Sequence, residues 1–471
     1  MTRTSSGRIL LTLAAGAWAS CRHAPPQDGF FRAGPTAPAS LPADGIFPQG
    51  RTMHIGGYSP GHMPQKQLGG IVPLELAQKS GFTVAGPYYG AFAGSRATVE
   101  RAAELGMHVA AQLQVPPVLR FAKGEDPLAL RGARMAALPE AELRAWVRSD
   151  MDNFLTNPVL ERAVSCWAIA PEELRHWRKP ELDYEQSFLR AVKDFDPRGR
   201  PAFMYEPNNR DAQGLLKTGP GQGFVLEGSY VHSYGWDVRR SLRINWAMDQ
   251  ITGAAARDGR VVVPGLQLSQ DMPGFTAKDL EADPSARARL RRLLRHDVYL
   301  AIARGAQGFQ VWSLHPSRPA MTTYLDLVRG YGEAFRELTM PPMALQEAIL
   351  FGERRSDVTL EVARGPASIA APPKEGTLEA VEGTIDVRPD RWPSVRLANL
   401  AFGTGRVLIL VNSAADPVQA RLGGLPADAR VDILSGGDAA VLARSAAGAD
   451  VSLEPFAALI LKVSRGNDRR R

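Results

Sequence analysis

The chain has 471 residues, of which 44% are hydrophobic and 22% charged, and its formal net charge is +7. This length exceeds one ordinary hydrophobic core and predicts a large domain of about 250–300 residues with a smaller one. The charge lies mainly at the ends, because the body without residues 1–20 and 464–471 keeps only about +2. We therefore expect a soluble globular protein without a nucleic-acid partner, since such a partner needs a basic stripe on the fold itself.

Residues 1–21 are typical of a bacterial export signal. Two arginines precede an apolar stretch at 9–18, and small residues lead to Cys21. The ending is similar to a lipoprotein signal, in which Cys21 is acylated, but Trp18 stands where that pattern usually has Leu. Lipid anchoring at the outer membrane and plain export to the periplasm or medium both stay open. Residues 22–50 are rich in Pro, Ala and Gly, which predicts a tether and not a core.

Short apolar strands alternate with helical segments between residues 51 and 347. We predict strands at 52–58, 82–89, 108–114, 164–170, 202–206, 224–234, 261–268 and 308–314, and helices at 95–105, 139–155, 184–195, 239–257 and 284–304. Eight strands with helices between them predict a (β/α)8 TIM barrel. An open sheet of six or seven strands is the alternative.

The pattern changes after about residue 348. Strand-like runs at 395–402, 406–411, 418–422, 430–434 and 457–463 are separated by Gly and Asn, and no helical spacing intervenes. This pattern predicts a small all-β sandwich over residues 348–464. Residues 465–471 form a basic tail.

Cysteine and histidine give little reason to expect a disulfide or a metal. The two cysteines are Cys21 and Cys166, and Cys166 lies within an apolar strand, where it reads as a small buried hydrophobe. The sequence contains no His-x-x-His, Cys-x-x-Cys or EF-hand spacing. We therefore predict no metal and no cofactor.

Acidic residues gather where the predicted strands end, which is where this fold carries catalytic groups. Glu172 and Glu173 follow the fourth strand, Glu206 ends the fifth, Glu227 lies on the sixth and Asp271 follows the seventh. Glycoside cleavage needs one carboxyl to protonate the leaving oxygen and a second to attack or to activate water. These five are the catalytic candidates, although each also has a structural reading as a helix cap or an ion-pair partner.

Aromatic and amide side chains at the same strand ends suit a sugar, whose hydroxyls need polar partners and whose apolar face stacks on rings. Tyr230, His232 and Tyr234 alternate along the sixth strand and so face one side of it. The predicted substrate-binding residues are Tyr88, Asn208, Arg210, Tyr230, His232, Tyr234 and Trp312.

The Glu172-Glu173 pair, the Tyr230-x-His232-x-Tyr234 signature and the trailing sandwich together resemble clan A glycoside hydrolases, such as families 5 and 42. The resemblance covers most of residues 50–465. It implies that Glu173 is the acid/base, with Glu172 in the place of an Asn of that clan. His232, Tyr234 and the strand-eight Trp312 would match its binding residues.

The departure from the clan is at the seventh strand, where its nucleophile is a Glu and this chain reads LQLSQD. Asp271 is the nearest carboxylate, and Glu206 or Glu227 are the alternatives. The sequence thus predicts an exported glycoside hydrolase acting on a poly- or oligosaccharide. A polysaccharide lyase, with His232 or Tyr234 as base and Arg210 neutralising a uronate, and a non-catalytic glycan-binding lipoprotein are the competing hypotheses.

Overall fold

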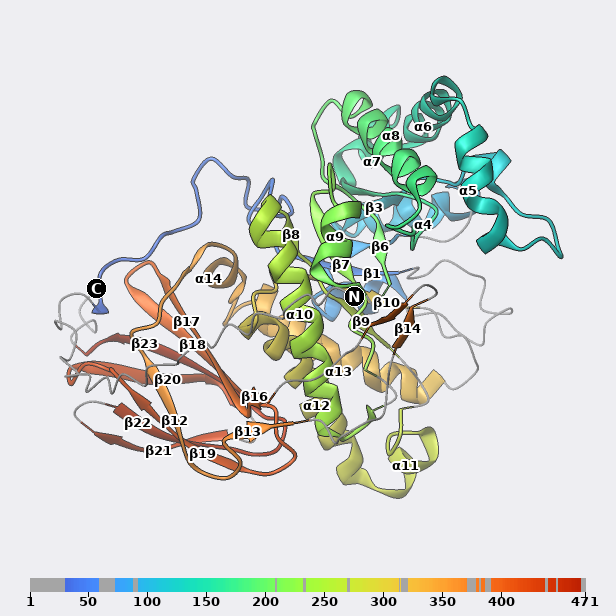
Figure 1. Cartoon of the computed structure of the whole chain (residues 1–471). Coiled ribbons are helices and arrows are strands. Elements are labelled where there is room, and N and C mark those ends of the chain that lie inside the picture. Colours follow the sequence, from blue (N-terminus) through green and yellow to red (C-terminus); the bar gives the residue numbers. More distant parts are fainter. Residues whose placement is uncertain are drawn as a thin grey trace, which may run out of the picture.

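The computed structural model describes residues 30–58, 73–87, 92–207, 210–231, 234–268, 272–312, 314, 321–370, 378–380, 383–385, 391–436, 439–445 and 448–466. A ring of parallel strands wrapped by helices comes first in the chain, and stacked antiparallel sheets follow it (Figure 1). Within these ranges, we find no helix with the length and apolar character needed to cross a membrane.

The parallel strands form a closed (β/α)8 barrel, as predicted. In chain order the eight positions are β1 (His54–Gly57), β2 (Val84–Ala85), β3 (His108–Gln112), β4 (Val164–Ala168), β5 with β6 (Ala202–Phe203, Tyr205–Glu206), β7 (Phe224–Glu227), β8 with β9 (Val261–Val262, Gly265–Gln267) and β10 (Gly308–Trp312). Each position pairs in parallel with the next. The ring closes because β10 pairs with β1, from His54 against Gly308 to Gly57 against Val311.

Successive side chains of these strands point alternately into the barrel and out towards the helices. The inward set forms an apolar cluster that includes Val84, Cys166, Phe203 and Phe224. Burial raises the pKa of the Cys166 thiol to about 12, so this residue is an inert hydrophobe, as the sequence predicted. His54 also points inward, 3.0 Å from Oε1 of a glutamine on β10.

Helices cover the outer face of the ring (Figure 1). They are α3 (Leu74–Lys79), α4 (Phe92–Glu104), α5 (Pro127–Ala137), α6 (Glu140–Leu155), α7 (Pro158–Ala163), α8 (Lys179–Phe195), α9 (Ala212–Thr218), α10 (Val238–Asp258), α11 (Ala277–Ala282), α12 (Pro284–Ala303), α13 (Met321–Thr339) and α14 (Gln346–Phe351), with a 3-10 turn η1 (Pro117–Leu119). Helix α10 shows the local rules: the Asp237 side chain accepts from the Arg239 N–H at its start, and Gly259 ends it at φ 77°.

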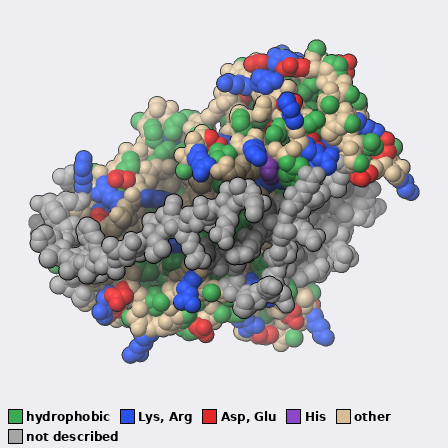
Figure 2. All heavy atoms as spheres, in the orientation of Figure 1, with side chains coloured by type: hydrophobic (Ala, Val, Ile, Leu, Met, Phe, Trp, Pro, Cys, Tyr) green, Lys and Arg blue, Asp and Glu red, His purple; other side chains and the backbone are tan. Residues whose placement is uncertain are grey.

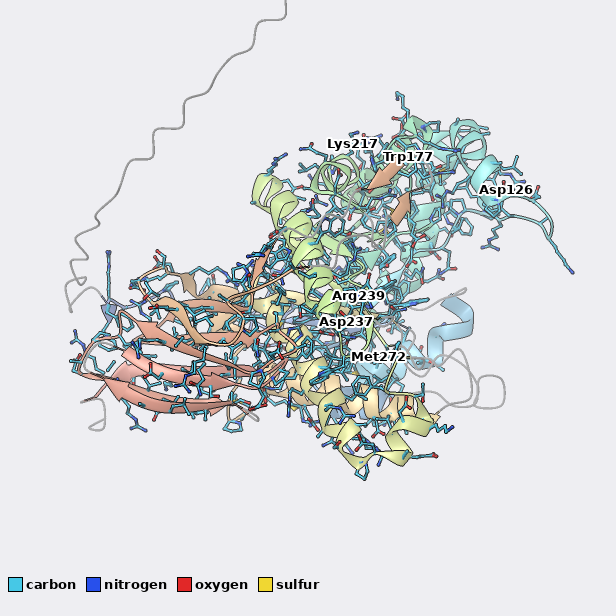
Figure 3. The ribbon with its side chains drawn as sticks, turned by 60° about the horizontal axis from the view of Figure 1, so that its bottom comes forward. Asp126, Trp177, Lys217, Asp237, Arg239 and Met272 are labelled. Carbon is cyan, nitrogen blue, oxygen red and sulfur yellow. The ribbon has the colours of Figure 1, made fainter. Side chains whose placement is uncertain are left out.

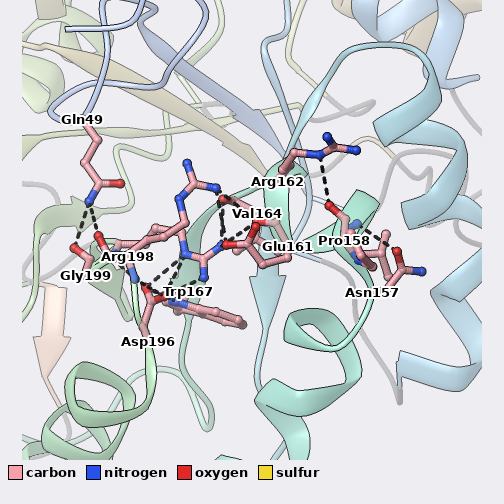
Figure 4. Close-up of polar contacts among 12 residues, drawn as sticks. Gln49, Asn157, Pro158, Glu161, Arg162, Val164, Trp167, Asp196, Arg198 and Gly199 are labelled. Atoms are coloured by element: carbon pink, nitrogen blue, oxygen red, sulfur yellow. Dashed lines mark hydrogen bonds and ion pairs between the residues drawn. The ribbon is translucent and has the colours of Figure 1, made fainter. Parts of the chain in front are cut away.

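The segment 30–50 belongs to the fold and is not a simple tether, which corrects the sequence prediction. Phe30 is buried in the sandwich core, and Ile46 is buried with the residues that fill the barrel. Gln49 donates to the carbonyls of Arg198 and Gly199 at 3.1 and 3.0 Å (Figure 4). A few apolar anchors thus fix a segment whose overall composition is that of a linker.

A buried ion pair stabilises the N-terminal end of β4, the strand that leads to the glutamate pair. Asp196 pairs with Arg200 at 2.6 Å. It also accepts a hydrogen bond from the indole N–H of Trp167 at 3.0 Å (Figure 4). Charge-assisted hydrogen bonds of this kind are the strong ones in proteins. They join β4 to the turn between α8 and β5 at the base of the barrel.

The C-terminal sheets form the predicted sandwich. One has the order β11–β17–β18–β23–β20 and the other β12–β19–β22–β21. Their bounds are β11 (Glu353–Arg354), β12 (Thr359–Arg364), β17 (Val395–Phe402), β18 (Gly405–Asn412), β19 (Val418–Gly423), β20 (Ala429–Ser435), β21 (Ala439–Ser445), β22 (Gly448–Leu453) and β23 (Ala458–Arg465), beside the short pairs β13 (Ser368–Ile369) with β16 (Trp392–Pro393) and β14 (Leu378–Ala380) with β15 (Gly383–Ile385). The five predicted strands are all present, and β11, β12, β21 and β22 of the two sheets had not been predicted.

The sandwich packs directly on the barrel helices. Arg240 of α10 pairs with Asp297 of α12, at 2.9 Å between Nε and Oδ1, and both side chains are fully buried. The neighbouring His296 lies 3.3 Å from the hydroxyl of Ser413 in the sandwich. Arg295 donates to a carbonyl of β23. Polar and apolar contacts therefore fix the two parts against each other.

Candidate active site

The C-terminal end of β4 brings one carboxyl group into the mouth of the barrel. After β4 the chain turns at Pro171, and the Glu172 carboxyl then accepts a hydrogen bond from the Tyr58 hydroxyl at 3.1 Å. Tyr58 follows β1, so the two residues come from different strands that meet at the same rim. The structure thus gives Glu172 a partner across the barrel mouth.

Glu172 is tuned to hold a proton near neutral pH. Glu172 is half-buried, and this burial is the main reason why the pKa of its carboxyl is raised from 4.5 to about 7. The Tyr58 hydrogen bond acts the other way and lowers the pKa, while the charge of Glu173 raises it further. A carboxyl with this pKa can exist as the acid and as the base at physiological pH, which suits proton transfer.

Glu173 is exposed beside Glu172 and its backbone is strained. Its φ of 59° lies in the left-handed region, which a non-glycine residue rarely adopts. Its N–H donates to the Tyr205 carbonyl at 3.1 Å. Arg131 donates to the carbonyls of Glu173 and Glu172 at 3.0 and 3.4 Å and pairs with the buried Glu181. The turn is therefore fixed from two sides, as strained functional turns must be.

Aromatic rings form two walls near these carboxyl groups. The rings of Tyr58 and Trp312 meet edge to face, with centroids 5.7 Å apart. Tyr205 and Tyr230 are stacked, with centroids 6.1 Å apart. Burial raises the pKa of both Tyr205 and Tyr230 above 10, so their hydroxyls stay neutral at physiological pH. Trp312 keeps partial exposure.

An amide on β3 adds a polar group to the same end of the barrel. Gln112 is the last residue of β3 and is half-buried. Its side-chain oxygen is shielded from solvent and has no hydrogen-bond partner among the described residues. A buried oxygen without a partner is available to a ligand hydroxyl or to a water molecule.

Glu206, Glu227 and Arg210 do not lie in the mouth, which corrects three sequence predictions. Because Tyr205 points into the barrel, its neighbour Glu206 points out. The same alternation turns Glu227 outward, and both carboxyl groups are buried between the strands and the helices. Arg210 is also buried, 3.4 Å from Glu206, and donates to the Leu174 carbonyl at 2.6 Å.

These outward residues form a buried polar cluster behind the barrel wall. Burial raises the pKa of Glu206 and raises that of Glu227 well above 4.5. Arg243 of α10 lowers the pKa of Glu227 by its charge, and Glu185 of α8 is bonded to Gln222. The cluster lies outside the barrel interior and cannot share a substrate with Glu172.

The remaining predicted residues lie at the rim or outside the described residues. Tyr234 is half-buried near the start of α10, where Arg239 stacks over its ring at 5.6 Å. Figure 3 shows Arg239, in the first turn of α10, close to Asp237 and to Met272, which lie on the loops after β7 and β9. The predicted residues Asp271, His232, Tyr88 and Asn208 lie outside the described residues.

The described part of the chain contains no candidate metal site. No group of three or more His, Cys, Asp or Glu side chains in that part is arranged to hold a metal ion. The face shown in Figure 2 carries acidic and basic side chains interspersed over the barrel helices. The carboxyl and aromatic groups around Glu172 are therefore the candidate active site.

Sequence reasoning missed Tyr205 and Gln112 and gave Tyr58 no specific role. The signal for Tyr205 was its spacing of two from Phe203, which puts both on one face of a strand. The sequence analysis named the neighbouring Glu206 as a catalytic candidate instead. Gln112 had no signal of its own, because a single amide in a strand is common in proteins.

No protein-family model matches the chain, and no curated protein is similar to it in sequence. Solved structures with a related fold include an α-amylase from Anoxybacillus, with a TM-score of 0.47 and 12% identity over 83% of this chain and 89% of that one. A family 30 subfamily 8 xylanase from Clostridium acetobutylicum gives 0.44 and 10% over 88% and 96%. A family 30 endoxylanase from Clostridium papyrosolvens gives 0.40 and 12% over the same shares. The barrel is defined by its own strand pairing, in which β10 pairs with β1 and closes the ring.

Proposed function

We propose that this protein is a glycoside hydrolase and that Glu172 is its proton donor. The observation that carries the proposal is a half-buried carboxyl, at the C-terminal mouth of a closed barrel, with a pKa of about 7. The sequence resemblance gave this role to Glu173. The greater burial of Glu172 and its bond to Tyr58 favour Glu172 instead.

In the proposed reaction Glu172 protonates the glycosidic oxygen as the bond from that oxygen to the anomeric carbon breaks. The bonding electron pair leaves with the oxygen, which departs as an alcohol. A second carboxylate either attacks the anomeric carbon or removes a proton from water that attacks it. One water molecule is consumed, and its oxygen ends on the anomeric carbon of the new reducing end.

The second carboxylate is Glu173 or Asp271. Glu173 is the carboxyl whose charge acts on Glu172. Asp271 follows β9 in sequence, at the position where the resemblance expects a nucleophile. Glu206 and Glu227 are not proposed, because their side chains are buried behind the barrel wall.

The aromatic walls support a sugar as the substrate. Rings such as Trp312 and Tyr230 stack on the apolar face of a pyranose, and neutral hydroxyls and amides such as Gln112 bond its hydroxyl groups. The lyase hypothesis loses its main support, because Arg210 is buried away from the mouth and bonded to Glu206.

The experiment is a reducing-end assay of the purified protein on a panel of poly- and oligosaccharides. We expect wild-type turnover on at least one of them, and a loss of about 10²–10⁴-fold in Glu172→Gln. Glu173→Gln and Asp271→Asn identify the second carboxylate, because removing the carboxylate that attacks or activates water stops cleavage, whereas removing the other one does not. Glu206→Gln, which is buried elsewhere, is the matched control. Near wild-type turnover in Glu172→Gln would refute the assignment.

We also propose that the chain is exported and that Cys21 is its lipid attachment site. The charged start, the apolar stretch and the small residues before Cys21 support this proposal. Labelled fatty acid should be incorporated by the wild type and not by Cys21→Ser. Export without label in the wild type would leave a secreted or periplasmic protein.

A further inference from the structure

One end of the sandwich carries a basic hollow, far in the sequence from the glutamate pair. The hollow has a volume of about 440 Å³ and is lined by residues that include Phe402, Arg430, Asp432, Lys462 and Arg465. Arg430, Lys462 and Arg465 are exposed, whereas Asp432 is the one acidic side chain among the lining residues and is half-buried. Three exposed cations therefore face one carboxylate.

The strand register places Arg430, Asp432 and Lys462 together on one face, and Arg465, the last residue of β23, lines the same hollow. On β20 and β23, Asp432 is opposite Lys462, and Arg430 is opposite Ser464. Cross-strand partners share a face, and residues two apart in a strand do as well. Arg430 also pairs with Asp432 at 2.8 Å, which leaves the basic side in excess. The hollow is thus suited to an anion such as a phosphate or a carboxylate.

The first described residues are attached at this same end. Nε of Arg406, another lining residue, donates to the Phe30 carbonyl at 2.9 Å. Gly34 and Gly403 are hydrogen-bonded at 2.8 Å, so the start of the described chain lies along β17 and β18 (Figure 1). Arg465 stacks over the Phe31 ring at 5.3 Å.

Cys21 and the C-terminal arginines are both close in sequence to residues at this end of the sandwich. Cys21 precedes Phe30 by nine residues, a length that spans at most about 30 Å when fully extended. The last described residue, Gly466, lines the hollow, and the five residues that follow it include three arginines. An acyl group on Cys21 would therefore hold this end of the sandwich close to a bilayer.

We propose that this basic end of the sandwich lies against an anionic membrane surface, and that the hollow takes the phosphate of a lipid headgroup. Electrostatic attraction of a basic patch to anionic lipids adds to the binding that buried acyl chains give. Each basic side chain near an anionic surface improves binding about fivefold, so three improve it about 100-fold. The proposal does not rest on glycosidase activity.

The test is flotation of the chain from Arg22 onward, which holds every described residue and no acyl group, with lipid vesicles. We expect binding to phosphatidylcholine vesicles that contain about one third phosphatidylglycerol, and none to pure phosphatidylcholine. The triple variant Arg430→Glu/Lys462→Glu/Arg465→Glu should bind more weakly by at least about 100-fold, because it removes three cations and adds three anions. About 0.5 M salt should abolish wild-type binding, because it shortens the screening length to a few ångströms.

The matched control reverses three exposed cations on the barrel helices, Lys193, Arg257 and Lys278, with the same change in net charge. This control should retain vesicle binding. Equal losses in the two triples, equal binding to neutral vesicles, or binding to polygalacturonate without vesicle binding would each overturn the proposal. Thermal melting reports whether the variants fold, and the single variants Lys462→Glu and Arg465→Glu serve if the triple does not. Each single variant should lose at least about fivefold, because it removes one cation and adds one anion.

Discussion

Replacing Tyr58 with Phe removes the hydroxyl that donates to Glu172 and keeps the ring that meets Trp312. The hydrogen bond favours the ionised carboxylate, so its loss should raise the pKa of Glu172 above its present value of about 7. A hydrogen bond to a charged group contributes about 1.5–3 kcal/mol. The distance of 3.1 Å is long for an O–H···O bond and favours the lower figure.

At about 1.36 kcal/mol per pKa unit, this lower figure raises the pKa by about one unit. The acid form of Glu172 is the active one in the proposed reaction, so the rate falls as pH rises through its pKa. At pH 8 about one molecule in ten carries the proton in the wild type, and about half do in Tyr58→Phe. The alkaline limb of the kcat/KM profile should therefore move up by about one pH unit.

The assay is the pH dependence of kcat/KM for both proteins on the substrate identified by the reducing-end panel. Tyr299→Phe is the matched control, because its hydroxyl donates to a different carboxyl, Glu337, at 2.5 Å on the outer helices. This control should leave the alkaline limb in place. A limb that does not move in Tyr58→Phe, or that moves to lower pH, would refute the role given to Glu172.

Three further outcomes follow from the buried charges. Glu172→Asp should keep a proton donor but shorten its reach, and should lower kcat/KM by about 10²-fold in the reducing-end assay. The melting temperature of the wild type should fall as pH rises above about 5, because the pKa of Glu227 is raised in the folded state while the unfolded chain ionises near 4.5. Glu227→Gln should flatten this decline. Arg240→Met leaves Asp297 buried without its partner and should cost about 3–5 kcal/mol in urea unfolding, most of which Arg240→Met/Asp297→Asn should recover.

The barrel was predictable because parallel strands covered on both faces read as short apolar runs between helices. The same property hid which way each side chain points. Along 202–206 the inward Phe203 and Tyr205 and the outward Met204 are all buried, so the alternation that marks a half-buried strand is missing. Two adjacent residues therefore have opposite positions: Tyr205 points into the barrel, and Glu206 is buried between the strands and the helices.

The raised pKa of Glu172 could not be predicted from the sequence either. It depends on burial by the turn after β4 and on Tyr58, which is more than a hundred residues away in the chain. The missed strand β12 of the sandwich has a related cause. In β12 only two of six side chains are half-buried and the rest are exposed, so a strand held by its neighbours gave no hydrophobic signal.

The most direct measurement is hydrolysis of the identified glycan in water enriched in oxygen-18, followed by mass spectrometry of the products. Acid catalysis by Glu172 with attack of water predicts one labelled oxygen on the new reducing end of every product molecule, and no products from Glu172→Gln. Unlabelled, unsaturated products would mean elimination instead of hydrolysis. Labelled products formed at equal rates by the wild type and Glu172→Gln would mean that another group donates the proton.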